Sequence, residues 1–389
     1  MNLLFVYLRP VLPTHGGTER VTHTVAQALR KQGHTIYFMA TKATEKDAKL
    51  NLPSNYFLID EATNHETRKQ IIVDTCAKFN IDVLFHIAGE TGDYDIFSNK
   101  VIPNTKIISC LHFDVYGFIK HFLRGHSTSR LKQWVIDTLY AIGINLHYLK
   151  WRSHYRRRYR EMLDASDAVV VVTPIIAEQL KQFTGINSGK IVSILNPVPF
   201  DNVQPAYDTR AKEKLIIYAG HLSPTKHVEK ILKAWAEVAP RHTDWKLEIA
   251  GDGKEKANLM HLVNSRNIPR VHFHGRISDV NSLYNRAEYF LLASDCESFG
   301  CVVVESLAYG CYPIIMDYPS AKVVIPDSRI GIRLKKHSST ELAKALDYAI
   351  SNNITNRYNM DAITRHLESF NMEKLVMEWQ ALLTKITHQ

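Results

Sequence analysis

The sequence YFLLASDCESFGCVVVESLAYGCYPIIM, residues 289–316, decides which class of fold the chain can adopt. Its pattern predicts, in order, a buried strand, a loop, a helix, a glycine stop and a second buried strand, at Tyr289–Ala293, Ser294–Phe299, Gly300–Tyr309, Gly310 and Tyr312–Met316. A helix that starts at the carboxyl end of a parallel strand directs backbone N–H groups and the positive end of its dipole at one point. Anions bind at such a point, phosphate most commonly. The stretch therefore predicts a phosphate site at the start of this helix.

Two glutamates flank the predicted phosphate site. Glu297 comes just before the helix, and Glu305 lies about five residues into it, roughly 7 Å along the axis at ~1.5 Å per residue. Carboxylates repel a diphosphate, so we expect them to accept hydrogen bonds from hydroxyl groups on its two sides. A sugar, a diphosphate and a ribose fit this arrangement. An acid pair of Asp295 and Glu297 that binds a metal is the alternative, which ranks lower because no third carboxylate is nearby.

The composition is typical of a soluble globular protein with two domains. The 389 residues are long enough for two separate cores, and 45% hydrophobic with 22% charged residues is an ordinary balance. Five cysteines without a CxxC pair indicate reduced thiols of a cytosolic protein rather than disulfides or a zinc site. The start, MNLLFVYLRP, predicts a buried strand rather than a signal peptide, and no apolar run approaches the roughly eighteen residues of a membrane span.

Strands and helices alternate along the whole chain, and the strands are continuous apolar runs. We expect strands at Leu3–Leu8, Thr35–Thr41, Asp82–Ile87, Thr105–Leu111, Ala168–Thr173, Lys190–Leu195, Leu215–Ala219, Lys246–Ala250, Val271–His274, Tyr289–Ala293, Tyr312–Met316 and Gly331–Leu334. Such runs predict α/β domains with parallel sheets covered on both faces.

The proline-rich segment after the first half predicts an interdomain linker. The expected organisation is a first domain at 1–198, a linker at 199–214, a second domain at 215–369, and a final helix at about 370–389 that packs back on the first domain. Open α/β sheets bind ligands at the carboxyl ends of their strands, so we expect the site in a cleft between the domains.

Two loops of the first half carry candidate residues. Gly16 and Gly17 let the backbone approach a phosphate or sugar at the start of the next helix, although a plain tight turn explains paired glycines as well. His112 follows the strand Thr105–Leu111, where it can contact a substrate hydroxyl or a developing positive centre. The alternative is a half-buried histidine that is hydrogen-bonded to Asp114.

In the second half, the segment Gly220–Lys226 follows the first strand and precedes an amphipathic helix. Lys226 at the helix start is a point charge suited to a diphosphate leaving group. A solvated lysine is the ordinary alternative. The next loop, Gly251-Asp252-Gly253, predicts a structural turn.

Five motifs occur in register along the chain: GGTER, GHLSPTK, HGRISD, ESFGCVVVE and ESLAYGCYPI. With them the chain resembles the retaining glycosyltransferases of the GT-B fold, family four (glycosyl transferases group 1), over nearly its full length and most strongly over Ile216–Ile315. The resemblance implies two doubly wound Rossmann-like domains facing a central cleft. It also implies a hexosyltransferase that moves a sugar from a UDP- or GDP-linked donor, a substrate, to an acceptor hydroxyl. It implies neither a metal ion nor a cofactor.

The resemblance also assigns roles to residues. It implies that Glu297 binds hydroxyls of the donor sugar, that Lys226 neutralises the phosphates and that His112 lies over the reacting sugar, the three as catalytic residues. The donor-binding residues that it implies are Gly16, Gly17, Gly220, His221, Lys226, Glu297, Phe299, Gly300, Cys301, Val302 and, on the ribose, Glu305.

The chain departs from the family pattern at two places. The family usually has arginine where His221 stands, so a permanent charge is replaced by a conditional one. The usual Gly-Gly turn after the last donor-site strand is replaced by Tyr318-Pro319-Ser320-Ala321. Because of this replacement, the family pattern does not predict the shape of this loop or the sugar that the site selects.

The net charge of +9 is concentrated in Lys120–Arg160, which holds ten Lys and Arg and one acid, Asp137. Aromatic residues alternate with the arginines, which predicts either attachment to an anionic membrane surface or a solvated helix packed on its own domain. The first alternative suits a lipid-linked or glycan acceptor, cell-surface polysaccharide or glycolipid assembly, and a cytoplasmic protein held on the inner face of the membrane. No motif supports nucleic-acid binding.

Two other functions remain open from the residues. A sugar-nucleotide epimerase of the same fold would bind the same donor without an acceptor. A non-catalytic module that binds a nucleotide sugar would release no nucleotide with any acceptor.

Overall fold

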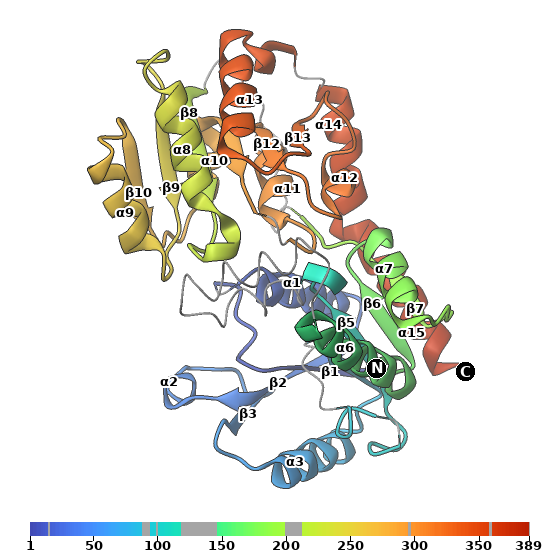
Figure 1. The fold of residues 1–389 in the computed structure, drawn as a ribbon. Helices are drawn as coiled ribbons and strands as arrows, with labels where there is room; N and C mark the ends of the chain where they lie inside the picture. The colour runs from blue at the N-terminus through green and yellow to red at the C-terminus, as the bar shows by residue number, and fades with distance from the viewer. Residues whose placement is uncertain are drawn as a thin grey trace. The chain divides into compact units, whose positions relative to one another are not determined.

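The computed structural model describes residues 1–14, 16–87, 94–98, 100–117, 146–198, 212–294, 297–357 and 360–388. The chain forms two compact units, one of Met1–Phe200 with Met372–Gln389 and the other of Asp201–Asn371 (Figure 1). Each unit has a parallel sheet with helices packed on it, so the predicted α/β class is confirmed.

In its described part, unit 1 has a sheet of seven strands in the order β3-β2-β1-β4-β5-β6-β7, in which every neighbouring pair is parallel. Its strands are β1 (Asn2–Tyr7), β2 (Thr35–Ala43), β3 (Tyr56–Asp60), β4 (Val83–His86), β5 (Lys106–Leu111), β6 (Ala168–Val171) and β7 (Ile191–Ser193). Its helices are α1 (Gly17–Lys31), α2 (Glu45–Ala48), α3 (His65–Lys78), α6 (Leu146–Ala165), α7 (Pro174–Thr184) and α15 (Met372–Thr387). The strand order reverses direction between β1 and β4, as in a doubly wound fold.

Successive side chains of β1 point to opposite faces of the sheet, and both faces are covered. Leu4 and Val6 are in one cluster with Ile72 and Cys76 of α3. Phe5 points to the other face, where α1 lies. This explains why β1 is a continuous apolar run rather than an alternating one.

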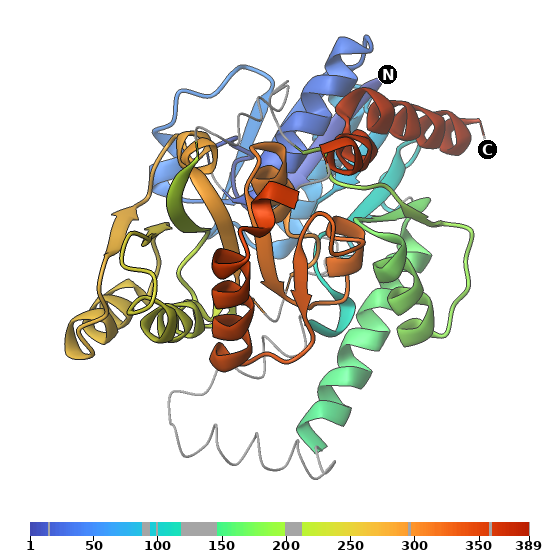
Figure 2. The same cartoon turned by 90° about the horizontal axis from the view of Figure 1, so that it is seen from above.

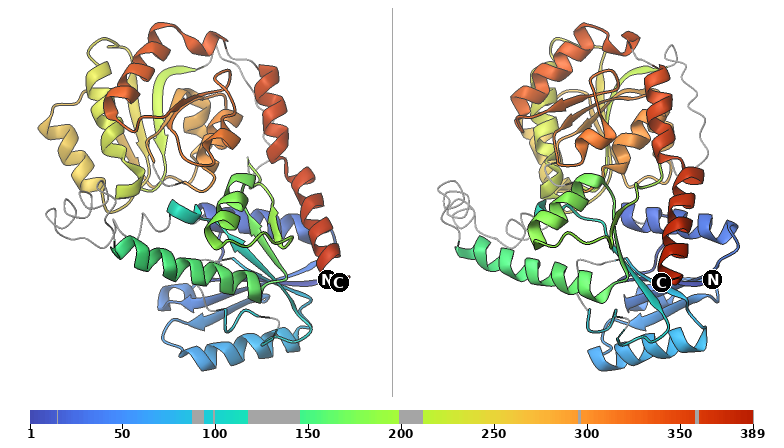
Figure 3. Two further views of the ribbon diagram at one scale, coloured as in Figure 1. Left: turned by 45° about the vertical axis from the view of Figure 1, so that its right-hand side comes forward. Right: turned by 90° about the vertical axis from the view of Figure 1, so that its right-hand side faces the viewer.

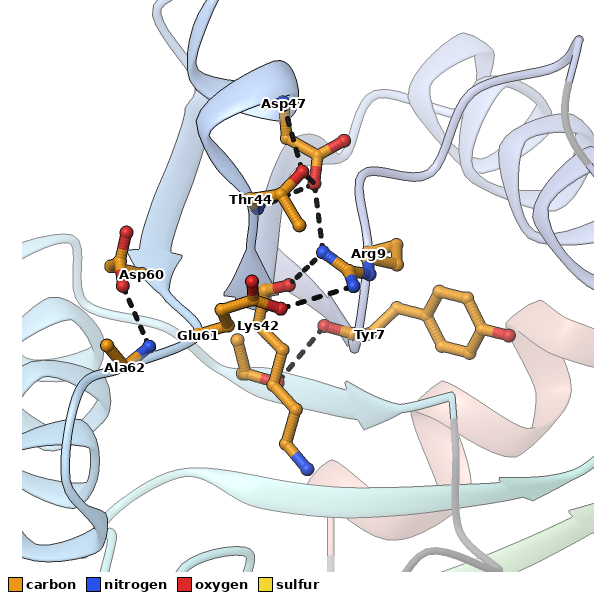
Figure 4. Close-up of polar contacts among 9 residues, drawn as sticks. Tyr7, Arg9, Lys42, Thr44, Asp47, Asp60, Glu61 and Ala62 are labelled. Atoms are coloured by element: carbon orange, nitrogen blue, oxygen red, sulfur yellow. Dashed lines mark hydrogen bonds and ion pairs between the residues drawn. The ribbon is translucent and has the colours of Figure 1, made fainter.

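The loop after β1 is tied down by Arg9. Its guanidinium donates to the carbonyl of Lys42 at 2.7 Å and contacts the carboxylates of Asp47 at 3.2 Å and Glu61 at 3.3 Å (Figure 4). Asp47 also closes a capping box with Thr44 at the start of α2. Arg9 thus fixes the start of the loop that leads to Gly16 and Gly17.

The last helix, α15, belongs to unit 1 although it follows unit 2 in sequence. It lies beside α1 (Figures 2 and 3). Its buried face includes Trp379, whose ring centroid is 5.7 Å from that of Phe85 on β4. Gln380 on the same helix contacts His34, with 2.8 Å between their side-chain nitrogens.

Unit 2, within the residues described, has a sheet of six strands in the order β10-β9-β8-β11-β12-β13, again all parallel. The strands are β8 (Glu213–Ala219), β9 (Lys246–Ala250), β10 (Val271–Gly275), β11 (Ala287–Leu292), β12 (Tyr312–Met316) and β13 (Ile332–Leu334). The helices are η3 (Pro224–Lys226), α8 (Val228–Val238), α9 (Lys256–Ser265), α10 (Asn281–Arg286), α11 (Cys301–Ala308), α12 (Ala321–Val324), α13 (Ser339–Ser351), η4 (Ile354–Arg357), α14 (Met360–Leu367) and η5 (Glu368–Phe370). The strand order reverses between β8 and β11, which lie side by side.

The element boundaries differ from the predictions in a few places. Glu213 and Lys214, which the sequence assigned to the linker, begin β8. The strand β3 was not predicted, because it is an edge strand whose only fully buried residue is Ile59 and which therefore lacks an apolar run. Gly310 ends the central helix as predicted, with a positive φ of 77°. Among the described residues no helix is long and apolar enough to cross a membrane.

Candidate functional site

The predicted donor residues of unit 2 gather where β8 and β11 end. Lys226 lies in the loop after β8, and Glu297 lies in the loop after β11. Because β8 and β11 are adjacent parallel strands at which the strand order reverses, their following loops lie at the same end of the sheet, where open α/β sheets bind ligands. The fold therefore brings together two residues that are 71 positions apart in sequence.

Lys226 and Glu297 form an ion pair. The ammonium Nζ is 2.5 Å from Oε1 of the carboxylate, and the two side chains are 24% and 13% exposed. A second contact holds the same two loops together, since the Ser294 hydroxyl donates to the carbonyl of Thr225 at 3.2 Å. The site thus presents a cation and a carboxylate side by side, each still accessible to solvent.

The helix α11 begins directly after Glu297. Its N-cap is Gly300, in the left-handed region with φ of 84°, which turns the chain from the loop into the helix. Phe299 and Gly300 are buried, while Cys301 and Val302 are half-buried. The first N–H groups of a helix have no partner within it, so this end of α11 can bind an anion through backbone groups.

Glu305 lies on the buried side of α11. Its side chain belongs to a residue that is 2% exposed, and its Oε2 accepts a hydrogen bond from the Tyr284 hydroxyl at 3.3 Å. Glu297 and Glu305 therefore differ in setting, since Glu297 is paired with the Lys226 ammonium and Glu305 accepts a hydrogen bond from a buried phenol.

The loop Gly220–Leu222 lies against the turn that follows β9. A Cβ added at Gly251 would be 1.9 Å from the carbonyl oxygen of Gly220, and one added at Gly253 would be 2.3 Å from that of Leu222. The Gly-Asp-Gly sequence is thus needed for close approach of two backbones, as the predicted structural turn implied. The His221 side chain is exposed.

Two buried tyrosines hydrogen-bond to the backbone of these loops, and neither was predicted from the sequence as a site residue. The Tyr218 hydroxyl donates to the carbonyl of His221 at 3.1 Å, and the Tyr318 hydroxyl donates to that of Phe299 at 2.9 Å. Burial raises the pKa of both phenols, and the nearby charge of Glu297 raises it further. Tyr318 belongs to the segment that departs from the Gly-Gly pattern, which was the only signal for it in the sequence.

In unit 1, Gly16 and Gly17 form the start of α1. Gly16 is the N-cap, and both glycines are exposed. A Cβ at Gly17 would meet no atom within 4 Å, whereas one at Gly16 would be 2.7 Å from Oε2 of Glu19. The first turn of α1 also carries Glu19. The residue before these glycines, His15, lies outside the described residues.

His112 follows β5 and lines an apolar pocket of unit 1 together with Val21, Thr22 and Trp379. Burial lowers the pKa of His112 to about 4, so the imidazole is neutral at pH 7. The neighbouring Asp114 accepts hydrogen bonds from the backbone N–H groups of Tyr116 and Gly117 at 2.8 and 2.7 Å, and so caps the turn that follows.

Comparison with known families shows what these two units are. The model described as Glycosyltransferase Family 4 matches residues 15–202, and the model described as Glycosyl transferases group 1 matches residues 200–366. Together they match most of the chain. The chain belongs to the GT-B glycosyltransferases.

The glycosyltransferase is similar to proteins of known sequence over nearly its full length. It is 24% identical to an uncharacterised glycosyltransferase of Haemophilus influenzae, covering 95% of this chain and 96% of that protein. It is 27% identical, with the same coverage of both chains, to a Campylobacter jejuni α-1,4-N-acetyl-D-galactosaminyltransferase, whose name gives a glycan on PP-undecaprenol as acceptor. Its fold matches that of HepE from Anabaena in complex with UDP, with a TM-score of 0.74 at 15% identity, over 99% of this chain and 100% of that one.

The basic segment of the glycosyltransferase is described only in part. Residues 118–145, which include more than half of the basic segment Lys120–Arg160, lie outside the described residues. In α6, Tyr155 and Tyr159 are buried, with Tyr159 edge-on to Phe183 of α7. Both tyrosines therefore pack in the core of unit 1, as the alternative of a helix packed on its own domain predicts, and attachment to a membrane surface stays a prediction. Arg152, Arg156, Arg157 and Arg160 are exposed, and Arg158 is half-buried.

The acid pair considered as a metal site is also described only in part, since Asp295 lies outside the described residues. Glu297 has Lys226 as its partner. Within the described part of the chain, no three His, Cys, Asp or Glu side chains lie close enough together to hold a metal ion.

Proposed function

We propose that this glycosyltransferase is a retaining enzyme that moves a sugar from a UDP- or GDP-linked donor to an acceptor hydroxyl. The observation that carries the proposal is the ion pair of Lys226 and Glu297 next to the amino end of α11. A diphosphate needs positive charge and N–H donors, and a sugar needs a hydrogen-bond acceptor. The arrangement places a cation, backbone N–H donors and a carboxylate acceptor together, at the end of the unit 2 sheet where β8 and β11 finish.

The donor would exchange the partners of the ion pair. Its diphosphate takes the ammonium of Lys226 and the N–H groups at residues 299–302, and a sugar hydroxyl donates to the carboxylate of Glu297. Glu305, on the following turns of α11, would accept from the ribose. Gly16 and Gly17 of unit 1 would approach the diphosphate with their backbone; the surroundings of Gly17 are open, whereas the Glu19 carboxylate lies beside Gly16.

In the transfer step the bond between the anomeric carbon and the phosphate oxygen breaks, and a bond between that carbon and the acceptor oxygen forms on the same face. The transition state is oxocarbenium-like, as in glycoside chemistry generally. The acceptor proton passes to the departing phosphate oxygen, whose negative charge Lys226 and α11 stabilise. His112, neutral at pH 7, would lie over the reacting sugar, where its backbone carbonyl faces the developing positive charge.

We propose that the reaction needs neither a metal ion nor a cofactor. The fixed ammonium of Lys226 and the end of a helix dipole supply positive charge of the kind that a divalent cation gives in other enzymes. Activity retained after dialysis against EDTA supports this part, and activity lost with EDTA and restored by Mg²⁺ or Mn²⁺ contradicts it.

We propose a glycan or lipid-linked acceptor bound by unit 1, in polysaccharide or glycolipid assembly on the cytoplasmic face of the membrane. The acceptor named for the Campylobacter relative supports this class. Exposed arginines of α6 such as Arg152, Arg156 and Arg157 would attract anionic lipid at about 1 kcal/mol each near the surface. Flotation with phosphatidylglycerol vesicles at low and high salt tests this attachment, and unbound protein at low salt contradicts it.

Donor binding and turnover test the main proposal. A thermal-shift screen of UDP, GDP and their common sugar conjugates is expected to raise the melting temperature with one nucleotide class. Incubation with that donor and candidate acceptors is expected to release the nucleoside diphosphate, and NMR of the product gives the anomeric configuration. An inverted product refutes retention. Isomerised donor without acceptor indicates the epimerase instead, and no release with any acceptor favours a binding module.

A further inference from the structure

We propose that Tyr218 and Tyr318 are positioning residues for the donor diphosphate, each of which holds one of the two loops that grip it. The proposal rests on the function proposed above and adds two residues to it. Both tyrosines are buried, at 0% and 5% exposure, so neither is proposed to contact the donor. Each acts through the backbone of a neighbouring loop.

Tyr318 holds the start of α11 through a hydrogen bond to the backbone. Its hydroxyl donates to the carbonyl of Phe299 at 2.9 Å, directly before the N-cap glycine. A Cβ at Gly300 would be only 2.1 Å from the Tyr318 oxygen, so the phenol occupies the space that any other side chain at 300 would need. The ring of Phe299 is fixed in turn by an edge-on contact with Phe370, with centroids 5.6 Å apart.

Tyr218 supports the other loop in the same manner. It is the penultimate residue of β8, and its hydroxyl donates to the carbonyl of His221 at 3.1 Å. A Cβ at Gly220 would be 2.9 Å from the Tyr218 oxygen. The two loops thus share one arrangement. In each, a tyrosine hydroxyl lies against a glycine and donates a hydrogen bond to the carbonyl of the residue next to that glycine.

The two hydrogen bonds hold the segments that carry the two partners of the ion pair. The Tyr318 bond fixes the segment between Glu297 and α11, and the Tyr218 bond fixes the segment that leads to Lys226. Backbone donors stabilise a phosphate only when they are held in place beforehand, since their geometry decides the strength of the hydrogen bonds.

Unit 2 offers matched controls for this role. Tyr289 and Tyr312 are also buried, at 0% and 2% exposure, and their hydroxyls also donate to backbone carbonyls, of Ala349 at 2.8 Å and Ser328 at 2.9 Å. These carbonyls are not in the loops after β8 and β11. A phenylalanine at any of the four positions keeps the ring and removes the hydroxyl together with its hydrogen bond to a backbone carbonyl.

The test compares Tyr218→Phe and Tyr318→Phe with the controls Tyr289→Phe and Tyr312→Phe. Calorimetry with UDP and with GDP gives the affinity, steady-state kinetics with the accepted donor give kcat and KM, and thermal unfolding gives the stability. All four variants are expected to lose stability, because each loses the hydrogen bond between its hydroxyl and a backbone carbonyl. Only the two site variants are expected to weaken nucleotide binding, by about five- to tenfold, with a matching rise in donor KM.

Affinities and KM values of the site variants that equal those of the controls overturn the proposal, because the tyrosines then only stabilise the fold. The two loops are tested separately, so a variant that fails to fold leaves the other to decide. Wild-type protein that binds neither UDP nor GDP overturns the proposed function and this inference with it. Wild-type binding with unaffected site variants overturns the inference alone.

Discussion

The substitution Lys226→Ala tests the proposed site most directly. At about 4 Å and an effective dielectric constant of about 20, an ammonium and a phosphate charge attract each other by about 4 kcal/mol. Lys226 must first leave Glu297, 2.5 Å away, which offsets part of this gain in the ground state. The charge that develops on the leaving diphosphate adds to the gain in the transition state. We therefore expect kcat to fall by about a hundredfold to a thousandfold, more than the donor affinity falls.

The assay is the release of nucleoside diphosphate under saturating donor, with circular dichroism to check the fold. Lys246→Ala is the matched control, since Lys246 also forms ion pairs in unit 2, with Glu213 at 2.9 Å and Glu248 at 3.4 Å, but at the first residue of β9, where the strand begins. Its turnover should match the wild type. If Lys226→Ala retains kcat within about threefold of the wild type, the ammonium does not stabilise the leaving group and our reasoning is refuted.

Three further outcomes are expected. Gly300→Ala should destabilise unit 2 by about 3 kcal/mol in urea unfolding, because it combines a positive φ with a contact at 2.1 Å to Tyr318; an unchanged midpoint contradicts the packing. In a Cys296→Ser background UDP or GDP should slow alkylation of Cys301 at the start of α11, and equal rates with and without nucleotide would contradict the anion site. Burial lowers the pKa of His86 to about 3, so protonation at acid pH favours the unfolded state and stability is lost as pH falls from about 6.5 towards 3. Because the lowered pKa of His112 also costs stability over the same range, His86→Phe should reduce the loss between pH 7 and 5 by about 2 kcal/mol without abolishing it. An equal loss in the wild type and the variant would exclude His86 as a source.

Most of the fold could be predicted from the sequence because its strands are continuous apolar runs. Runs such as Ala168–Val171 and Tyr312–Met316 are buried on both faces, and this makes them visible in the sequence. The edge strand Tyr56–Asp60 was missed because only one of its residues is fully buried. Burial of both faces is thus the property that the sequence pattern detects.

The candidate site was predictable where a residue acts through its own side chain. Lys226 and Glu297 stand out in the sequence because each follows a predicted strand and comes at the start of a predicted helix. Tyr218 and Tyr318 act through the backbone of other residues, and an isolated tyrosine in an apolar run looks like any core residue. The pairing of Lys226 with Glu297 also depends on which strands are adjacent, and this becomes visible only when the strand order is known.

The return of α15 to unit 1 has a practical consequence for dividing the protein. Unit 1 is assembled from two separate pieces of the gene, so expression of residues 1–200 alone would leave Phe85 without Trp379 and one side of α1 uncovered. Such a fragment would expose an apolar surface to other copies of itself, and we expect it to aggregate. A well-behaved half-molecule should instead be made by grafting residues 372–389 onto the end of 1–200 through a short flexible tether, whereas 201–371 can be excised as one uninterrupted block.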